Sequence, residues 1–177
     1  MTDALPPESD KAASEAAKAK GPAAAQSAAD SKWGAEPGSA PASVLFACNL
    51  NTIRSPMAAA LMKRRFSAVH VDSCGVWPGG YTDPFMTEVM AELGPDLTAH
   101  EPRTFEELDD LSFDLIVALT EPSYERALEL ARTRDCEVEF WELADPSDAG
   151  ETRTQRLNAY RAVRDELDRK IKERFKR

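Results

Sequence analysis

From Ser43 onward, short apolar runs alternate with longer segments in which apolar residues recur at helical spacing. This alternation is typical of an α/β protein with a parallel sheet, because each strand must be followed by a crossover helix. We expect strands at residues 44–47, 69–73, 115–119 and 138–141, and helices at residues 56–66, 84–93, 122–131 and 157–175, with a short helix after Thr104. The pattern predicts a doubly wound, open, four-stranded parallel sheet.

Residues 1–42 have a different composition, built almost entirely from Ala, Ser, Pro, Gly, Lys, Asp and Glu. Leu5 and Trp33 are the large apolar residues in this segment, so it cannot bury a core of its own. We therefore expect a disordered, solvated tail at residues 1–42 and one folded domain at residues 43–177.

The net charge limits the partners that the chain can attract. With 31 acidic and 22 basic residues the formal charge is −9, which gives no general attraction to nucleic acid or anionic lipid. No apolar run reaches the length of a membrane span, and the first residues lack the apolar core of a signal peptide. We expect a cytoplasmic monomer that binds neither nucleic acid nor membrane.

Three cysteines without a C-x-x-C pair fit neither a disulfide framework nor a structural zinc site. Cys48 follows the first strand directly and opens the loop Asn49-Leu50-Asn51-Thr52-Ile53-Arg54-Ser55, after which Pro56 marks a helix. Ligands of open parallel sheets bind beyond the carboxyl ends of the strands. A loop of this length, with a helix N-terminus behind it, can direct backbone N–H groups into one anion-binding hollow.

The residue types in this loop suit phosphoryl transfer. Arg54 offers a planar fork of donors to two phosphate oxygens, and the same positive field favours the thiolate form of Cys48, a nucleophile. The Ser55 hydroxyl is expected to donate a hydrogen bond to that sulfur. A cysteine that merely packs is the common alternative, but an arginine six residues later and a serine seven residues later rarely follow one by chance.

At this point the sequence resembles the low-molecular-weight protein tyrosine phosphatases and their arsenate reductase relatives, whose motif is Cys-x5-Arg-Ser. Asn51 in the loop, Ser73 after the second strand, Asp83-Pro84 before the second long helix and Asp145-Pro146 after the fourth strand also match. The resemblance implies a three-layer α/β/α fold in which Asn51 and Ser73 support the loop. It also implies that Asp145 is the general acid, a role that the chemistry of phosphate ester cleavage supports.

Several positions depart from the family pattern. Leu50 stands where the family usually has glycine, and Ile53 replaces a second cysteine that can protect the nucleophile by a disulfide. Ser147 and Asp148 stand where many phosphatases carry tyrosines that wall the substrate slot. Trp77 is near the family's aromatic pocket position, with core packing an equally good interpretation.

We predict a phosphate monoester hydrolase that forms a phosphocysteine on Cys48 and acts on phosphotyrosine in proteins or on small aryl phosphates, without metal or organic cofactor. Thiol-dependent arsenate reduction is one alternative, for which Cys74 and Cys136 would be the candidate relay thiols, although both suit buried or half-buried packing better. A phosphate-binding module that has lost turnover is the other.

Overall fold

The computed structural model describes residues 40–176, so the predicted tail lies almost wholly outside the described residues. The elements follow one another in the order β1 (Ser43–Cys48), α1 (Arg54–Arg65), β2 (His70–Gly75), α2 (Pro84–Ala91), a short 3-10 helix (Phe105–Glu107), β3 (Leu115–Ala118), α3 (Glu121–Ala131), β4 (Glu137–Phe140) and α4 (Arg153–Arg174). The expected strands and helices are all present, with ends shifted by a few residues.

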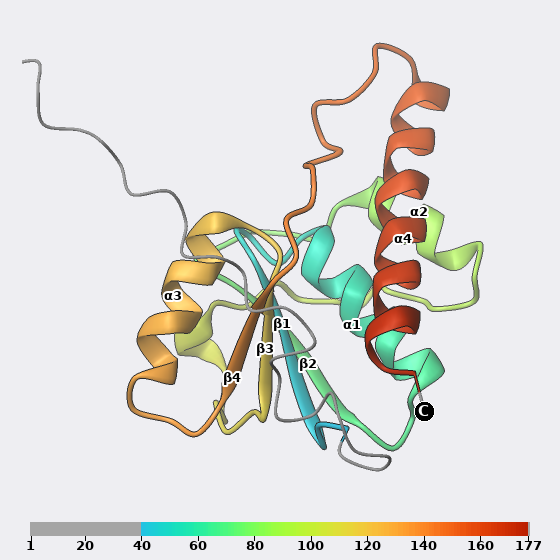
Figure 1. Cartoon of the computed structure of the whole chain (residues 1–177). Helices are drawn as coiled ribbons and strands as arrows, with labels where there is room; N and C mark the ends of the chain where they lie inside the picture. Colours follow the sequence, from blue (N-terminus) through green and yellow to red (C-terminus); the bar gives the residue numbers. More distant parts are fainter. Residues whose placement is uncertain (1–39, 177) are drawn as a thin grey trace, which may run out of the picture.

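The four strands form one parallel sheet in the order β2-β1-β3-β4, which confirms the predicted open sheet (Figure 1). The chain moves from β1 to β2 on one side and then to β3 on the other, so the strand order reverses at β1. A reversal of this kind leaves a crevice beyond the carboxyl ends of the neighbouring strands. Cys48 is the last residue of β1 and lies at this crevice.

Two helical layers cover the two faces of the sheet. Successive side chains of β1 point to opposite faces, because a strand alternates its side chains with a period of two. Val44 and Phe46 belong to the core under α1 and α4, whereas Leu45 and Ala47 belong to the core under α3. Figure 1 shows α1 and α4 on one side of the sheet and α3 on the other, with α2 beside α4. The three-layer architecture is therefore confirmed.

Local sequence signals explain where the helices begin. Asp83 caps α2 by accepting hydrogen bonds from the backbone N–H groups of Phe85 and Met86, and Pro84 occupies the first helical position. Tyr160 of α4 donates a hydrogen bond to the same carboxylate at 3.0 Å, and this contact ties α2 to α4. Capping boxes at Thr120 and Thr152 open α3 and α4.

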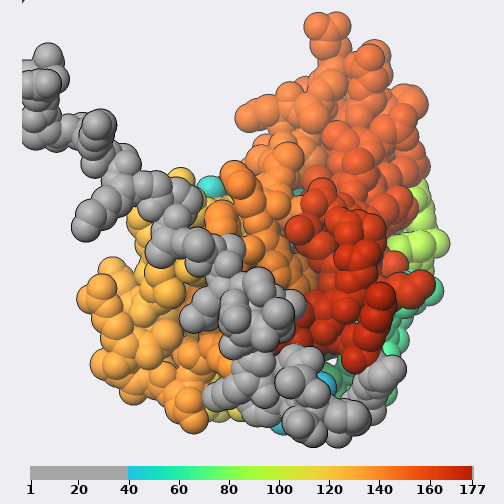
Figure 2. All heavy atoms as spheres, in the orientation of Figure 1, coloured from blue at the N-terminus to red at the C-terminus, as the bar shows by residue number. Residues whose placement is uncertain are grey.

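The segment between β4 and α4 carries the Asp145-Pro146 pair. It rises from the end of β4 to the top of the molecule before α4 begins, and Figure 2 shows it standing out beside the first turns of that helix. The far end of α4 is fixed to β4 by an ion pair between Arg174 and Glu139 at 2.7 Å, with both side chains less than a tenth exposed. None of the helices within residues 40–176 is long and apolar enough to cross a membrane.

A carboxylate between two arginines makes the contact of α2 with α4 sensitive to acid. Glu92 accepts hydrogen bonds from Arg161 and Arg164, which lower its pKa from 4.5 to about 2. A depressed carboxyl pKa stabilises the fold above pH 4.5, and this contribution is lost as the pH falls toward 2. We expect Glu92→Gln to lower the melting temperature at pH 7, with the difference from the unmodified chain shrinking progressively below pH 4.5.

Thermal unfolding of both proteins across this pH range measures the effect. Glu125→Gln, the same exchange at an exposed position of α3, is the matched control. A difference between Glu92→Gln and the unmodified chain that stayed constant with pH would contradict the role of this carboxylate.

Candidate active site

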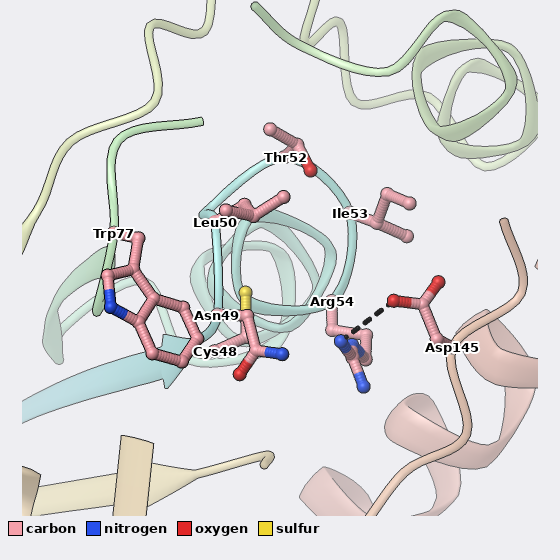
Figure 3. Close-up of a pocket in the computed structure, with 8 residues that line it drawn as sticks. All are labelled: Cys48, Asn49, Leu50, Thr52, Ile53, Arg54, Trp77 and Asp145. Atoms are coloured by element: carbon pink, nitrogen blue, oxygen red, sulfur yellow. Dashed lines mark hydrogen bonds and ion pairs between the residues drawn. The ribbon is translucent and has the colours of Figure 1, made fainter. Parts of the chain in front are cut away.

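The loop between β1 and α1 forms the floor of the candidate site. It joins the end of β1 at Cys48 to the start of α1 at Arg54, so its position follows directly from the two elements that it connects. In Figure 3 the loop curves from Asn49 past Thr52 to Arg54, and the sulfur of Cys48 lies inside the curve. A helix N-terminus and a curved backbone at one place favour the binding of an anion.

Asn51 holds the curve of the loop. Its φ of 56° makes it the one non-glycine residue of the described chain in the left-handed region, which asparagine tolerates better than most residues. Its buried side chain donates to the hydroxyl oxygens of Ser55 and Ser73, both at 2.9 Å, and accepts from the backbone N–H of Arg103 at 2.9 Å. The backbone carbonyl oxygen of Asn51 lies 2.9 Å from Nε2 of His100. Asn51 thus joins the loop to Ser73 at the end region of β2 by a hydrogen bond.

The hydroxyl of Ser55 lies beside the sulfur of Cys48. Their Oγ and Sγ atoms are 3.0 Å apart and buried, and Ser55 Oγ also accepts the hydrogen bond from Asn51. Because an ionised thiol has no proton, the hydroxyl is the donor whenever Cys48 is a thiolate. Ser55 can therefore stabilise negative charge on this sulfur.

Arg54 and Asp145 form an ion pair across the mouth of the loop. One guanidinium nitrogen donates to Asp145 Oδ2 at 3.0 Å and the other to the carbonyl oxygen of Leu143 at 3.0 Å. The arginine side chain is 8 % exposed and the aspartate side chain 47 %. Partial burial raises the pKa of Asp145, but hydrogen bonds from Ser147 and the charge of Arg54 outweigh it and hold that pKa below its usual range.

A second segment, residues 75–83, packs against the outside of the loop. The backbone N–H groups of Val76 and Trp77 donate to the carbonyl oxygen of Asn49. A Cβ at Gly79 would lie 2.1 Å from the carbonyl oxygen of Leu50, a distance that no side chain allows. Glycine at position 79 is therefore required for this close approach.

These contacts explain how leucine fits the loop at position 50, where the family usually has glycine. Leu50 itself is not among the residues with positive φ, so the loop does not use a glycine-specific conformation at this position. Asn51 takes the left-handed position, and Gly79 makes room for the Leu50 carbonyl. The Leu50 side chain is 42 % exposed at the mouth of the loop.

One pocket brings together the predicted catalytic residues, most of the predicted phosphate-binding loop and Trp77, whereas Asn51, Ser55 and Ser73 are buried outside its lining. Its lining consists of Cys48, Asn49, Leu50, Thr52, Ile53, Arg54, Trp77 and Asp145 (Figure 3). Trp77 is 49 % exposed, so its ring is a wall of the pocket rather than part of the core. Asn49 Oδ1 is the one buried side-chain oxygen or nitrogen of residues 40–176 without a hydrogen-bond partner.

Among the contacts that sequence reasoning missed are those of Arg54 with Leu143 and of Leu50 with Gly79. The carbonyl of Leu143 binds Arg54, but any residue has a carbonyl, so the sequence carried no signal for this contact. Gly79 precedes another glycine, and such a pair indicates only a turn. The close approach of Gly79 to the loop could be known only from the structure.

The remaining cysteines lie away from the pocket. Cys74 is fully buried in the core under α3, on the opposite face of the sheet from Cys48. Burial, helped by the nearby carboxylate of Asp72, raises the pKa of the Cys74 thiol well above its usual value. Cys136 is half-buried and precedes β4. Both thiols occupy the buried or half-buried positions that were expected of them.

The fold and the site together define a class of small parallel α/β domains with a Cys-x5-Arg-Ser loop at the switch point of the sheet. A sequence model described as "Low molecular weight phosphotyrosine protein phosphatase" matches residues 43–177. The chain belongs to this family.

The solved structures that are similar to this chain belong to proteins with several different functions. The YwlE arginine phosphatase from Geobacillus stearothermophilus is 28 % identical, with a TM-score of 0.62 over 76 % of this chain and 90 % of that one. The arsenate reductase from Archaeoglobus fulgidus is also 28 % identical, with a TM-score of 0.57 over 73 % of this chain and 96 % of that one. The tyrosine phosphatase amsI from Erwinia amylovora is 22 % identical, with a TM-score of 0.63 over 79 % and 97 %, and supports the fold alone.

The hydrogen bonds of Asn51 predict a large effect of its removal. Asn51→Ala is expected to lower the free energy of unfolding by about 2–4 kcal/mol, because it removes several buried hydrogen bonds and places alanine at positive φ. Asn51→Gly relieves the backbone strain but not the loss of hydrogen bonds, so it should recover only about 1 kcal/mol. Denaturant unfolding of both variants measures the two contributions. Unfolding of Asn51→Ala at the same denaturant concentration as the unmodified chain would contradict the role of Asn51.

Proposed function

We propose that this chain is a cysteine-dependent phosphatase that hydrolyses phosphate monoesters through a phosphocysteine on Cys48. The observation that carries the proposal is the presence of a thiol, an arginine and a carboxylate in one pocket at the switch point of the sheet. Each supplies a different part of the chemistry: a nucleophile, a binder of phosphate oxygens and a proton donor.

In the first step the thiolate of Cys48 attacks phosphorus, a sulfur–phosphorus bond forms and the ester bond breaks. The bonding electron pair leaves with the ester oxygen, which takes a proton from Asp145. Arg54 and the backbone amides of residues 49–54 bind the three non-bridging oxygens and stabilise the charge that spreads over them.

The ion pair between Arg54 and Asp145 explains how Asp145 becomes a proton donor. Without substrate, Arg54 favours the ionised carboxylate. A bound phosphate dianion competes for the same guanidinium and brings negative charge close to Asp145, and both changes raise the pKa of that carboxyl. Substrate binding thus prepares the acid that the first step needs.

In the second step water attacks the phosphocysteine. Asp145, now a carboxylate, takes a proton from the water, inorganic phosphate is released and the electron pair of the sulfur–phosphorus bond returns to Cys48. The Ser55 hydroxyl, 3.0 Å from the sulfur, assists this departure by donating a hydrogen bond to the thiolate.

Phosphotyrosine in proteins, or a small aryl phosphate, is the substrate that we propose. The half-exposed ring of Trp77 supports this choice, because an aromatic wall beside the phosphate site can stack on an aryl leaving group. Ser147 and Asp148 supply no aromatic ring after Pro146, so Trp77 is the aromatic residue of the pocket lining.

Phosphoarginine is a second candidate substrate. The unpartnered Oδ1 of Asn49 favours it, because a rotation of this amide toward the pocket would offer an acceptor to the N–H groups of a guanidinium. The similarity to an arginine phosphatase at 28 % identity supports the same candidate.

Arsenate reduction is less well supported. A cysteine relay needs a second thiol that can reach the nucleophile, and its thiolate form must be accessible. Cys74 lies on the other face of the sheet with a raised pKa, and Ile53 occupies the loop position next to Arg54. The phosphate-binding module without turnover is a different outcome of the experiment below.

The experiment is steady-state hydrolysis of p-nitrophenyl phosphate, phosphotyrosine and phosphoarginine by the purified chain, with orthovanadate as a competitive inhibitor. Turnover that vanadate blocks supports the proposal, and the relative kcat/KM values choose the substrate class. Binding of vanadate without turnover of any of the three would contradict catalysis and favour the binding module.

The variant Asp145→Ala tests the role of the general acid separately from that of the nucleophile. We expect kcat for phosphotyrosine to fall by about 10²–10⁴, because its phenolate leaves poorly without a proton. The loss should be smaller for p-nitrophenyl phosphate, whose leaving group is more stable as an anion. Asp148→Ala, an exposed aspartate of the same segment, is the control. Equal losses on both substrates would contradict the assignment of Asp145 as general acid.

A further inference from the structure

Two of the exposed apolar side chains line the pocket. Four large hydrophobic residues of the described chain are exposed: Leu50 at 42 %, Trp77 at 49 %, Tyr81 at 80 % and Leu128 at 39 %. Leu50 and Trp77 line the pocket, whereas Leu128 lies on α3. Large apolar groups that cluster on the surface of an acidic protein indicate a place of binding.

Tyr81 stands four residues after Trp77, on the segment that packs against the loop. Its N–H donates to the carbonyl oxygen of Gly79 at 3.0 Å, and Gly79 packs directly on the backbone of Leu50. The segment that carries Trp77 and Tyr81 is therefore fixed to the loop that carries Leu50. We call these three residues, Leu50, Trp77 and Tyr81, the apolar rim.

The two walls of the pocket differ in character. Figure 3 shows Trp77 to the left of the Cys48 sulfur and Leu50 above it, with the pair of Arg54 and Asp145 to the right. The polar wall contains the groups that the phosphoryl chemistry uses, but the chemistry has no use for an exposed leucine or for Tyr81. A small aryl phosphate bound at Cys48 would leave most of the Leu50 and Tyr81 side-chain surface exposed to water.

We propose that the apolar rim binds an apolar side chain next to the phosphorylated residue of a protein substrate. This inference rests on the proposed phosphatase function and narrows its substrate to a protein segment with apolar residues beside phosphotyrosine. Leu50 and Trp77 line the catalytic pocket itself, so a chain whose phosphotyrosine reaches Cys48 brings its neighbouring residues close to them. Tryptophan and tyrosine are also the residues most enriched where binding energy concentrates in interfaces.

The experiment compares two phosphotyrosyl peptides that differ only in the residues on either side of the phosphotyrosine, leucine in one and serine in the other. We expect kcat/KM to favour the leucine peptide by about tenfold, mainly through KM, because the rim removes apolar surface from water. Tyr81→Ser and Leu50→Ser should each reduce this ratio toward one. A variant that slows hydrolysis of both peptides equally leaves the ratio of their kcat/KM values unchanged.

Leu128→Ser, the same kind of change at the exposed leucine of α3, is the matched control and should leave the tenfold ratio unchanged. Equal kcat/KM for the two peptides, or a ratio that survives in both rim variants, would overturn the inference. Failure to act on either peptide while p-nitrophenyl phosphate is hydrolysed would overturn it as well and leave the phosphatase function standing. Loss of both activities in the unmodified chain would remove the phosphatase function itself.

Discussion

Cys48→Ser is expected to lower kcat for p-nitrophenyl phosphate by at least about 10⁴-fold, to the limit of detection. The hydroxyl has nearly the shape of the thiol but is not ionised at neutral pH, so the nucleophile is lost while the loop keeps its hydrogen bonds. Cys48 is the one cysteine of the pocket lining, and its sulfur lies inside the curve of the loop, so no other lining residue supplies a thiol there.

Steady-state kinetics and vanadate binding together measure this effect. The variant should bind vanadate and unfold at nearly the same temperature as the unmodified chain, which would show that chemistry rather than folding is lost. Cys136→Ser, at a cysteine outside the pocket, is the control and should retain turnover. Substantial hydrolysis by the folded Cys48→Ser variant would contradict the phosphocysteine mechanism.

Arg54→Lys should have the second largest effect, a loss of about 10³ in kcat/KM. The charge is kept, but an ammonium group cannot donate in two fixed directions, as the guanidinium does to Leu143 and Asp145. Lysine would therefore neutralise a bound phosphate without fixing the positions of its oxygens. We expect both a weaker affinity for vanadate and a slower chemical step.

Arg126→Lys, on the surface of α3, is the matched control, because Arg126 forms ion pairs with Glu106 and Glu129 away from the pocket. This exchange should change kcat/KM by less than about twofold. Activity of Arg54→Lys within a fewfold of the unmodified chain would show that the bidentate geometry of Arg54 has no role.

The fold could be predicted because its signals are local. The apolar run Leu115–Ala118 is short and wholly buried, as a central parallel strand requires, and Asp83-Pro84 marks a helix start by residue type alone. The end of β2 was harder to predict, because Cys74 and Gly75 carry little strand propensity. Their pairing with Ala47 and Cys48 of β1, a contact distant in sequence, extends the strand to Gly75.

The core of the site could also be predicted, since the loop from Cys48 to Ser55 is continuous in sequence and its chemistry depends on residue types at fixed spacing. What the sequence could not supply is the way in which other segments complete it. Arg103 and His100 form hydrogen bonds with Asn51, and Gly79 contacts Leu50. The two residues of each contact are tens of positions apart in the sequence. Contacts of this kind form only when the chain folds, so no local sequence pattern indicates them.

The expectation about Leu50 illustrates the same limit. Leu50 stands where the family usually has glycine, and leucine resists some conformations that glycine allows. In the folded chain the left-handed residue is Asn51, and the leucine side chain turns outward to the apolar rim.

Detection of a phosphoryl group on Cys48 tests the central claim most directly. The enzyme is mixed with excess p-nitrophenyl phosphate, quenched with acid within milliseconds, digested and analysed by mass spectrometry for a phosphorylated peptide that contains Cys48. The mechanism predicts this adduct in the unmodified chain, a larger amount of it in Asp145→Ala with the same substrate, and none in Cys48→Ser. Turnover without any adduct on Cys48, at times when product is already forming, would contradict the mechanism.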